Sequence, residues 1–66
     1  MNKYRHYIVF YDDGHDSGEL TFTSVHKARS KGNLEDAERA LKCAYGYLRA
    51  NELRINWVER DLNYLD

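Results

Sequence analysis

Proline is absent from this chain, cysteine occurs once, and the formal net charge is only −1. A single cysteine cannot form an internal disulfide, which excludes the disulfide-stapled class of small secreted domains. Without proline and with glycines only at predicted turns or helix ends, no linker is visible, so residues 1–66 are expected to form a single domain. The longest apolar run, Tyr7–Tyr11, is too short to span a bilayer. No apolar leader is visible near the N-terminus, and we expect a cytoplasmic protein with no membrane association.

The small net charge also restricts the classes of molecule that this chain is expected to bind. A protein that binds nucleic acid non-specifically usually carries a basic excess, and a DNA mimic carries a large acidic one. This chain has neither, although its charges are grouped. Acidic residues gather around the first predicted turn, at Asp12, Asp13, Asp16 and Glu19. Basic residues gather before the predicted helix, at His26, Lys27, Arg29 and Lys31.

Patterns that specify a reaction are missing as well. The chain contains no CxxC pair, no phosphate-binding glycine loop and no arrangement typical of nucleophilic catalysis. The run from Asp12 to Asp16 lacks the ligand spacing of a calcium or zinc site, and aspartate and glycine are what a hairpin turn favours. Cys43 is predicted to be exposed, with no histidine placed beside it. We therefore predict no catalytic residues, no metal, no cofactor and no enzymatic activity.

Two runs rich in aromatic and β-branched residues, 4–11 and 19–25, flank an Asp/Gly loop and predict a β-hairpin. The favoured register places two apolar pairs on one face: Ile8 with Phe22, and Phe10 with Leu20. A register slipped by one residue would instead align Leu20 and Phe22 with the tyrosines of the first strand. Loop geometry, which decides between the two, is not readable from the sequence.

An amphipathic helix is predicted next, with Asn33 as its N-cap and its end near Ala50, although Gly46 is an alternative end. Its apolar stripe consists of Leu34, Ala37, Leu41, Ala44 and Leu48. Residues 53–59 alternate again and predict a third strand with Leu53, Ile55 and Trp57 on one face. The result is a small α+β domain of order β-β-α-β, with a three-stranded antiparallel sheet in spatial order 2-1-3 and one amphipathic helix packed on one face.

This arrangement predicts two candidate partner-binding surfaces. If the helix covers Ile8, Phe10 and Trp57, then Tyr7, Val9 and Tyr11 lie on the opposite face as an apolar patch with hydroxyl tips. That patch predicts a partner interface, a homodimer, or cover by the C-terminal Leu62, Tyr64 and Leu65. The second surface is the basic loop, with Lys27, Arg29 and Lys31 beside a helix N-terminus, where Glu35 and Asp36 would oppose an anion.

In length, aromatic richness, lack of proline and β-β-α-β pattern, the whole chain resembles small accessory proteins of phages and prophages, although it carries no motif of a named family. The resemblance implies a protein that binds and modulates a host component, such as a nuclease or a transcription factor. We therefore predict a non-enzymatic protein-binding module that acts through the aromatic sheet face, a strand edge or the basic loop. The alternative is a small nucleic-acid-binding protein that uses the basic loop and the sheet tyrosines.

Overall fold

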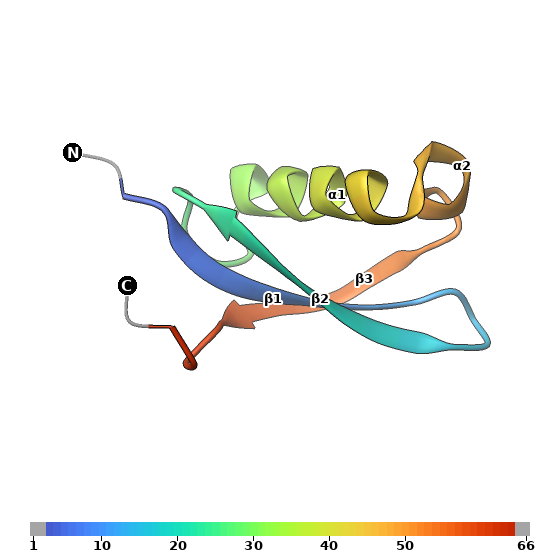
Figure 1. Ribbon diagram of the computed structural model, residues 1–66, viewed down its shortest axis with the longest axis horizontal. Coiled ribbons are helices and arrows are strands. Elements are labelled where there is room, and N and C mark those ends of the chain that lie inside the picture. The colour runs from blue at the N-terminus through green and yellow to red at the C-terminus, as the bar shows by residue number, and fades with distance from the viewer. Residues whose placement is uncertain (1–2, 65–66) are drawn as a thin grey trace.

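A computed structural model of the chain describes residues 3–64. Its elements are β1 (Arg5–Asp12), β2 (Ser17–Ser24), α1 (Lys31–Tyr45), α2 (Tyr47–Ala50) and β3 (Arg54–Arg60). The strands form an antiparallel three-stranded sheet in the order β2-β1-β3, and α1 lies over one face of that sheet (Figure 1). The predicted α+β fold and strand order are confirmed, with the short helix α2 as an addition.

The register of the hairpin is the slipped one. Tyr7 faces Phe22 and Val9 faces Leu20, so the predicted pairing of Ile8 with Phe22 and Phe10 with Leu20 is wrong. The physical reason is the loop, which consists of Gly14 and His15 and is closed by a bond from the Asp13 N–H to the Asp16 carbonyl at 3.1 Å. This closure fixes which residues face each other along the whole ladder.

A register shift moves part of the third strand to the other face. Phe10 pairs with Trp57, but Tyr11 pairs with Ile55, so Asn56 is an extra residue on β3. Ile55 therefore lies on the same face as Tyr11, whereas Trp57 lies on the face of Phe10. The prediction that Leu53, Ile55 and Trp57 share one face is wrong for Trp57, because a strict alternation does not include a bulge.

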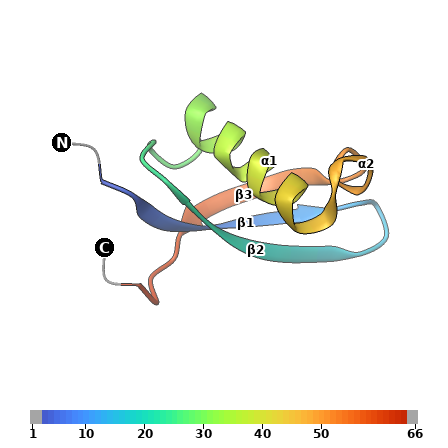
Figure 2. The same cartoon turned by 45° about the horizontal axis from the view of Figure 1, so that its top comes forward.

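The core lies between α1 and the tyrosine side of the sheet. The buried apolar residues are Tyr7, Val9, Tyr11, Phe22, Ala37, Leu41 and Val58. The predicted outward tyrosine face is thus an inward face, and Ile8, Phe10 and Trp57 are not under the helix. Figure 2 shows α1 crossing above the sheet, with the opposite face of the sheet uncovered by any helix.

Both ends of the helix differ from the prediction. The N-cap is Ser30, whose hydroxyl accepts a bond from the Asn33 N–H at 3.3 Å, and Asn33 itself is fully buried. At the other end Gly46 adopts a φ of 88°, which interrupts the helix before α2. As a result, Leu48 is 83% exposed and does not continue the stripe, while Leu41 is buried as predicted.

Candidate protein-binding face

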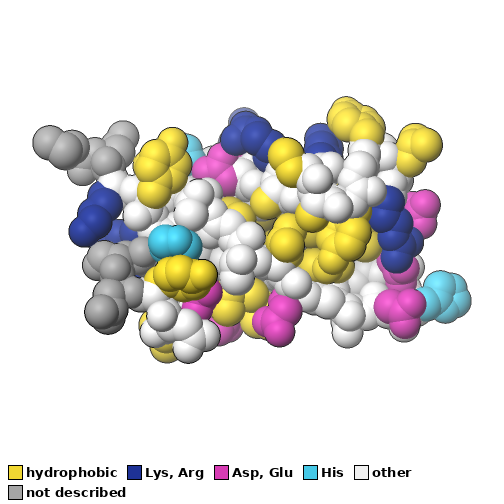
Figure 3. Space-filling model, viewed as in Figure 1, with side chains coloured by type: hydrophobic (Ala, Val, Ile, Leu, Met, Phe, Trp, Pro, Cys, Tyr) yellow, Lys and Arg dark blue, Asp and Glu magenta, His cyan; other side chains and the backbone are white. Residues whose placement is uncertain are grey.

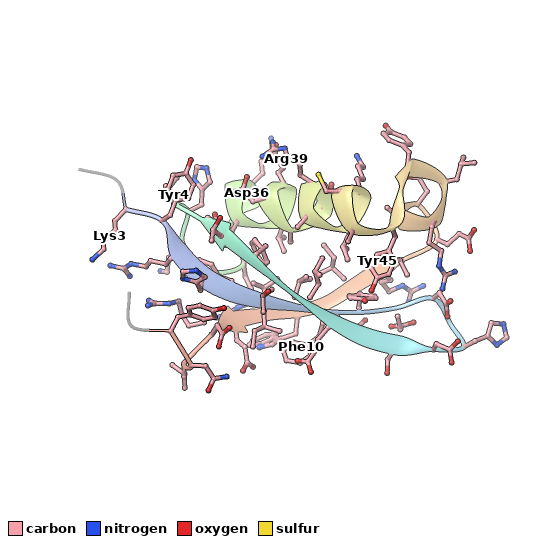
Figure 4. The ribbon with its side chains drawn as sticks, in the orientation of Figure 1. Lys3, Tyr4, Phe10, Asp36, Arg39 and Tyr45 are labelled. Carbon is pink, nitrogen blue, oxygen red and sulfur yellow. The ribbon has the colours of Figure 1, made fainter. Side chains whose placement is uncertain are left out.

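The open face of the sheet carries an apolar centre made of Ile8, Phe10 and Trp57. Phe10 lies directly opposite Trp57, and cross-strand partners share a face of the sheet. Ile8 and Phe10 are half-buried, and Trp57 is 49% exposed. Phe10 points away from the side of the sheet on which Tyr45 descends from the helix (Figure 4). We call this surface the open face; no helix covers its apolar side chains within residues 3–64.

Carboxylates border the open face. Glu19 lies opposite Phe10 on β2, and Glu59 lies opposite Ile8 on β3. Both glutamates are exposed. A sheet that stacks nucleotide bases on its aromatic rings needs cations near those rings to neutralise the phosphates, whereas carboxylates repel them. The open face thus carries carboxylates beside its apolar centre, together with one guanidinium, that of Arg29, 4.1 Å from the Trp57 ring centroid.

Arg29 connects the basic loop to the third strand. Its guanidinium donates to the Val58 carbonyl at 2.5 Å and lies over the Trp57 ring, 4.1 Å from the ring centroid. The residue itself adopts a φ of 65°, a left-handed conformation that aims the side chain toward β3. Arg29 thus contacts the β3 edge and Trp57 while its side chain stays exposed, and its role in binding a partner remains a prediction.

The remaining cations of the loop are exposed, at Lys27 and Lys31. Two hydrogen bonds hold the start of the basic loop in place, because the His26 carbonyl accepts from the Tyr7 hydroxyl at 3.0 Å and from the Asn33 side-chain amide at 3.3 Å. Since α1 begins at Lys31, its first turn contains no acidic residue. The prediction that Glu35 and Asp36 lie in that first turn is wrong.

In the hairpin turn, the carboxylates bind backbone groups. The Asp12 carboxylate accepts from the Gly14 N–H at 2.9 Å, and that of Asp13 accepts from His15 and Asp16, each at 2.8 Å. These bonds lower the pKa of Asp13, and Arg49, 2.6 Å from its carboxylate, lowers it further. The acidic cluster is a hairpin turn, as predicted, and among residues 3–64 no group of three metal-ligating side chains is found.

The C-terminal segment reaches one end of the open face. The Tyr64 ring stacks on the His6 ring with centroids 3.9 Å apart, and the Asp61 N–H donates to the His6 carbonyl at 2.9 Å. Leu62 is 90% exposed and covers nothing, and Leu65 lies outside the described residues. Tail residues therefore contact the face opposite the helix, but that face is not the tyrosine face.

Of the six predicted partner-binding residues, Tyr7, Val9 and Tyr11 are core residues. Lys27 and Lys31 are at the surface, and Arg29 is tied to β3. The sequence interpretation missed Ile8, Phe10 and Trp57 as surface residues. The signal that could have identified them is the turn Asp13-Gly14-His15-Asp16. When Asp13 lies opposite Asp16, odd-numbered residues of β1 lie opposite even-numbered residues of β2, which puts the tyrosines on the face of Leu20 and Phe22.

No protein-family model, no curated protein and no solved structure matches this chain. Within residues 3–64, no helix combines the length and apolar character needed to cross a membrane.

Proposed function

We propose that this chain is a non-enzymatic protein-binding module that uses the open face. The observation that supports this most is the apolar centre formed by Ile8, Phe10 and Trp57 on a sheet face that α1 leaves bare. Contiguous apolar surface on a small monomer generally marks an interaction site. Aromatic residues at the centre and polar ones around them are the usual anatomy of a protein interface.

The partner surface follows from the chemistry of the open face. An apolar pocket or ridge would meet Phe10 and Trp57, and lysine or arginine side chains around it would pair with Glu19 and Glu59. The resemblance to phage accessory proteins extends this proposal to a host defence or regulatory protein as the partner. The competing function is binding of nucleic acid through the basic loop. In that case Lys27 and Lys31 would supply most of the phosphate contacts, since Arg29 contacts Val58 and Trp57.

A matched pair of lysine variants tests the proposal. Ile8→Lys places a charge on the open face, and Leu48→Lys makes a comparable change at an exposed apolar residue of α2. Each protein is used for affinity capture from the native host's lysate with nuclease treatment. A partner retained by the wild type and by Leu48→Lys, but lost with Ile8→Lys, is the expected result. A partner that Ile8→Lys retains, or that nuclease removes from the wild type, contradicts the proposal.

Trp57 provides a second test because it is the only tryptophan of the chain. Its fluorescence therefore reports on the open face and on the Arg29 guanidinium that lies over its ring. Burial of the ring by a protein partner shifts the emission to shorter wavelength. Titration with single-stranded DNA or RNA at low salt is expected to leave the emission unchanged. Salt-sensitive quenching by an oligonucleotide would favour base stacking and the nucleic-acid alternative.

A further inference from the structure

The two edges of the sheet are protected differently. On β3, the Arg29 guanidinium donates a hydrogen bond to the Val58 carbonyl, which points away from β1. On β2, among residues 3–64, no hydrogen bond other than those of the ladder with β1 reaches the backbone of residues 19–23. This edge strand is eight residues long and contains no proline, lysine or arginine, and Glu19 is its only charged residue. An unprotected edge of this length can accept another strand.

The hairpin turn determines which backbone groups of β2 point outward. Hydrogen-bonded and non-hydrogen-bonded pairs alternate along an antiparallel ladder. Because Asp13 and Asp16 form a hydrogen-bonded pair, Val9 with Leu20 and Tyr7 with Phe22 are also hydrogen-bonded. The N–H and carbonyl groups that remain available at the edge belong to Glu19, Thr21 and Thr23. The same alternation turns the Val58 carbonyl outward on β3, where Arg29 binds it.

We propose that the occupant of this edge is a second copy of the chain, paired antiparallel through β2 about a two-fold axis at Thr21. In this register Thr21 faces Thr21 of the second copy, and Glu19 faces Thr23. On the helix side, Leu20 faces Phe22. No like charges oppose each other, and apolar residues meet apolar residues. The proposal does not depend on the proposed function.

Neighbouring registers are less favourable. An axis at Glu19 would place the two Glu19 carboxylates directly opposite each other. An axis at Thr23 would run the pairing past Ser24, the last residue of β2. Thr21 lies near the middle of the strand, so that an axis there uses nearly its full length. An axis at Leu20 would leave Phe22 opposite Gly18, and an axis at Phe22 would leave Leu20 opposite Ser24. Only an axis at Thr21 pairs these two apolar residues with each other.

A groove between the β2 edge and α1 provides room on the helix side. It measures about 660 Å³, and its lining includes Leu20, Phe22, Ala40, Cys43 and Ala44. Figure 3 shows hydrophobic side chains gathered between α1 and β2. Two contacts give the direction of α1 relative to β2. Near the start of α1, Asp36 accepts a bond from Ser24 at 2.6 Å. At its end, Tyr45 bonds Tyr11, which lies opposite Gly18 of β2.

Because α1 therefore runs antiparallel to β2, its middle, around Ala40, lies at the level of Thr21. The small side chains of Ala40, Cys43 and Ala44 leave space beside the β2 edge for the strand of the second copy. Pairing through β2 would join the two sheets into one continuous sheet and place two open faces side by side. Such a dimer presents each partner-binding surface twice, which raises avidity for a partner with two sites.

Two lysine substitutions on the same edge test the register. Thr21 and Thr23 are both exposed and lie on the same face of β2. Thr21→Lys places two ammonium groups opposite each other at the axis, whereas Thr23→Lys places each ammonium opposite a Glu19 carboxylate. The dimer dissociation constant, measured by sedimentation equilibrium at low salt, is expected to rise about fivefold or more for Thr21→Lys. For Thr23→Lys it is expected to stay unchanged or fall.

The controls separate this proposal from the other surfaces. Thermal unfolding confirms that each variant is folded, and Ile8→Lys, on the open face, is expected to leave the dissociation constant unchanged. A wild type that stays monomeric to millimolar concentration overturns the proposal. So does a dimer weakened equally by both threonine substitutions, or one that only Ile8→Lys disrupts. The last result would assign self-association to the open face.

Discussion

The two faces of the sheet are both rich in apolar groups, yet only one is covered. The covered face contains Tyr7, Val9 and Tyr11, and the open face contains Ile8, Phe10 and Trp57. The hydroxyl groups of the two buried tyrosines form hydrogen bonds with groups on the helix side of the sheet. Tyr7 donates to the His26 carbonyl at 3.0 Å, and the Tyr11 hydroxyl bonds that of Tyr45. A polar tip on an aromatic residue therefore does not indicate an outward face when a loop carbonyl or a helix side chain supplies a hydrogen-bond partner.

The largest expected effect comes from one charge placed on each face. Val9 is fully buried, so Val9→Lys puts an ammonium group into the core without a partner and should cost about 4 kcal/mol or more. That loss is comparable with the whole stability of a small domain. Ile8→Lys lies opposite Glu59 on the open face and should stay folded. Circular dichroism of both variants checks this; a folded Val9→Lys would reverse the assignment of the faces.

A second pair of substitutions compares two sides of α1. Leu41 is 2% exposed in the core, and Leu41→Ala should destabilise the domain by about 2–4 kcal/mol. Cys43 is exposed on the same helix, and Cys43→Ala should cost less than about 1 kcal/mol. Urea unfolding of the two variants gives both values. Equal losses would show that α1 is rotated about its axis relative to the structure.

Removal of the Arg29 side chain should have an intermediate effect. Arg29→Ala loses the bond to Val58 and the cation–π contact with Trp57, which together should contribute about 1–2 kcal/mol. Lys27→Ala, in the same loop, removes an exposed charge and should change stability by less than about 0.5 kcal/mol. Thermal unfolding checks the pair. Joint neutralisation of Lys27, Arg29 and Lys31 would therefore change the stability of the domain as well as its charge.

The last effect is a pH dependence of stability that appears only above about pH 10 and involves Tyr11 on the covered face. The bond with Tyr45, together with burial, raises the pKa of Tyr11 to about 12, from an ordinary value of 10.0. Between these values the folded state keeps the proton and the unfolded state loses it, so stability falls as the pH rises through this window. Tyr45→Phe removes the bond and should flatten the decline. Urea midpoints at about pH 9 and about pH 11.5 measure the difference; equal slopes would contradict the role of the pair.

Most of the architecture was readable from the sequence. The order of elements, the central position of β1 and the burial of Leu41 follow from periodicity and from β1 having two apolar faces. The identity of the covered face was not readable, because Ile8/Phe10 and Val9/Tyr11 are about equally apolar. A hairpin turn longer or shorter by one residue would align Leu20 and Phe22 with Ile8 and Phe10 instead of with the tyrosines. Turn closure depends on backbone dihedral angles rather than on hydrophobicity.

Two further errors have local causes. Ser30 and Asn33 are both good N-caps, and the choice of Ser30 depends on Asn33 being used to hold His26 and Arg29. The bulge at Asn56 separates Trp57 from Ile55, and its side chain bonds the Asp12 carboxylate at 2.5 Å. Neither the cap nor the bulge changes the hydrophobic pattern, so the pattern could not reveal them. The bulge explains why Trp57 does not share a face with Ile55, whereas the exchange of the two sheet faces comes from the hairpin register.

The central claim is that α1 covers the tyrosine face and leaves Phe10 and Trp57 open. The most direct measurement is a nuclear Overhauser spectrum of the wild-type protein, in which contacts are read from the Leu41 methyl groups. We predict cross-peaks to Val9 and Phe22, which belong to the same buried cluster, and none to Ile8 or Trp57. Cross-peaks from Leu41 to Ile8 or Trp57 would place the helix on the other face and remove the proposed binding surface.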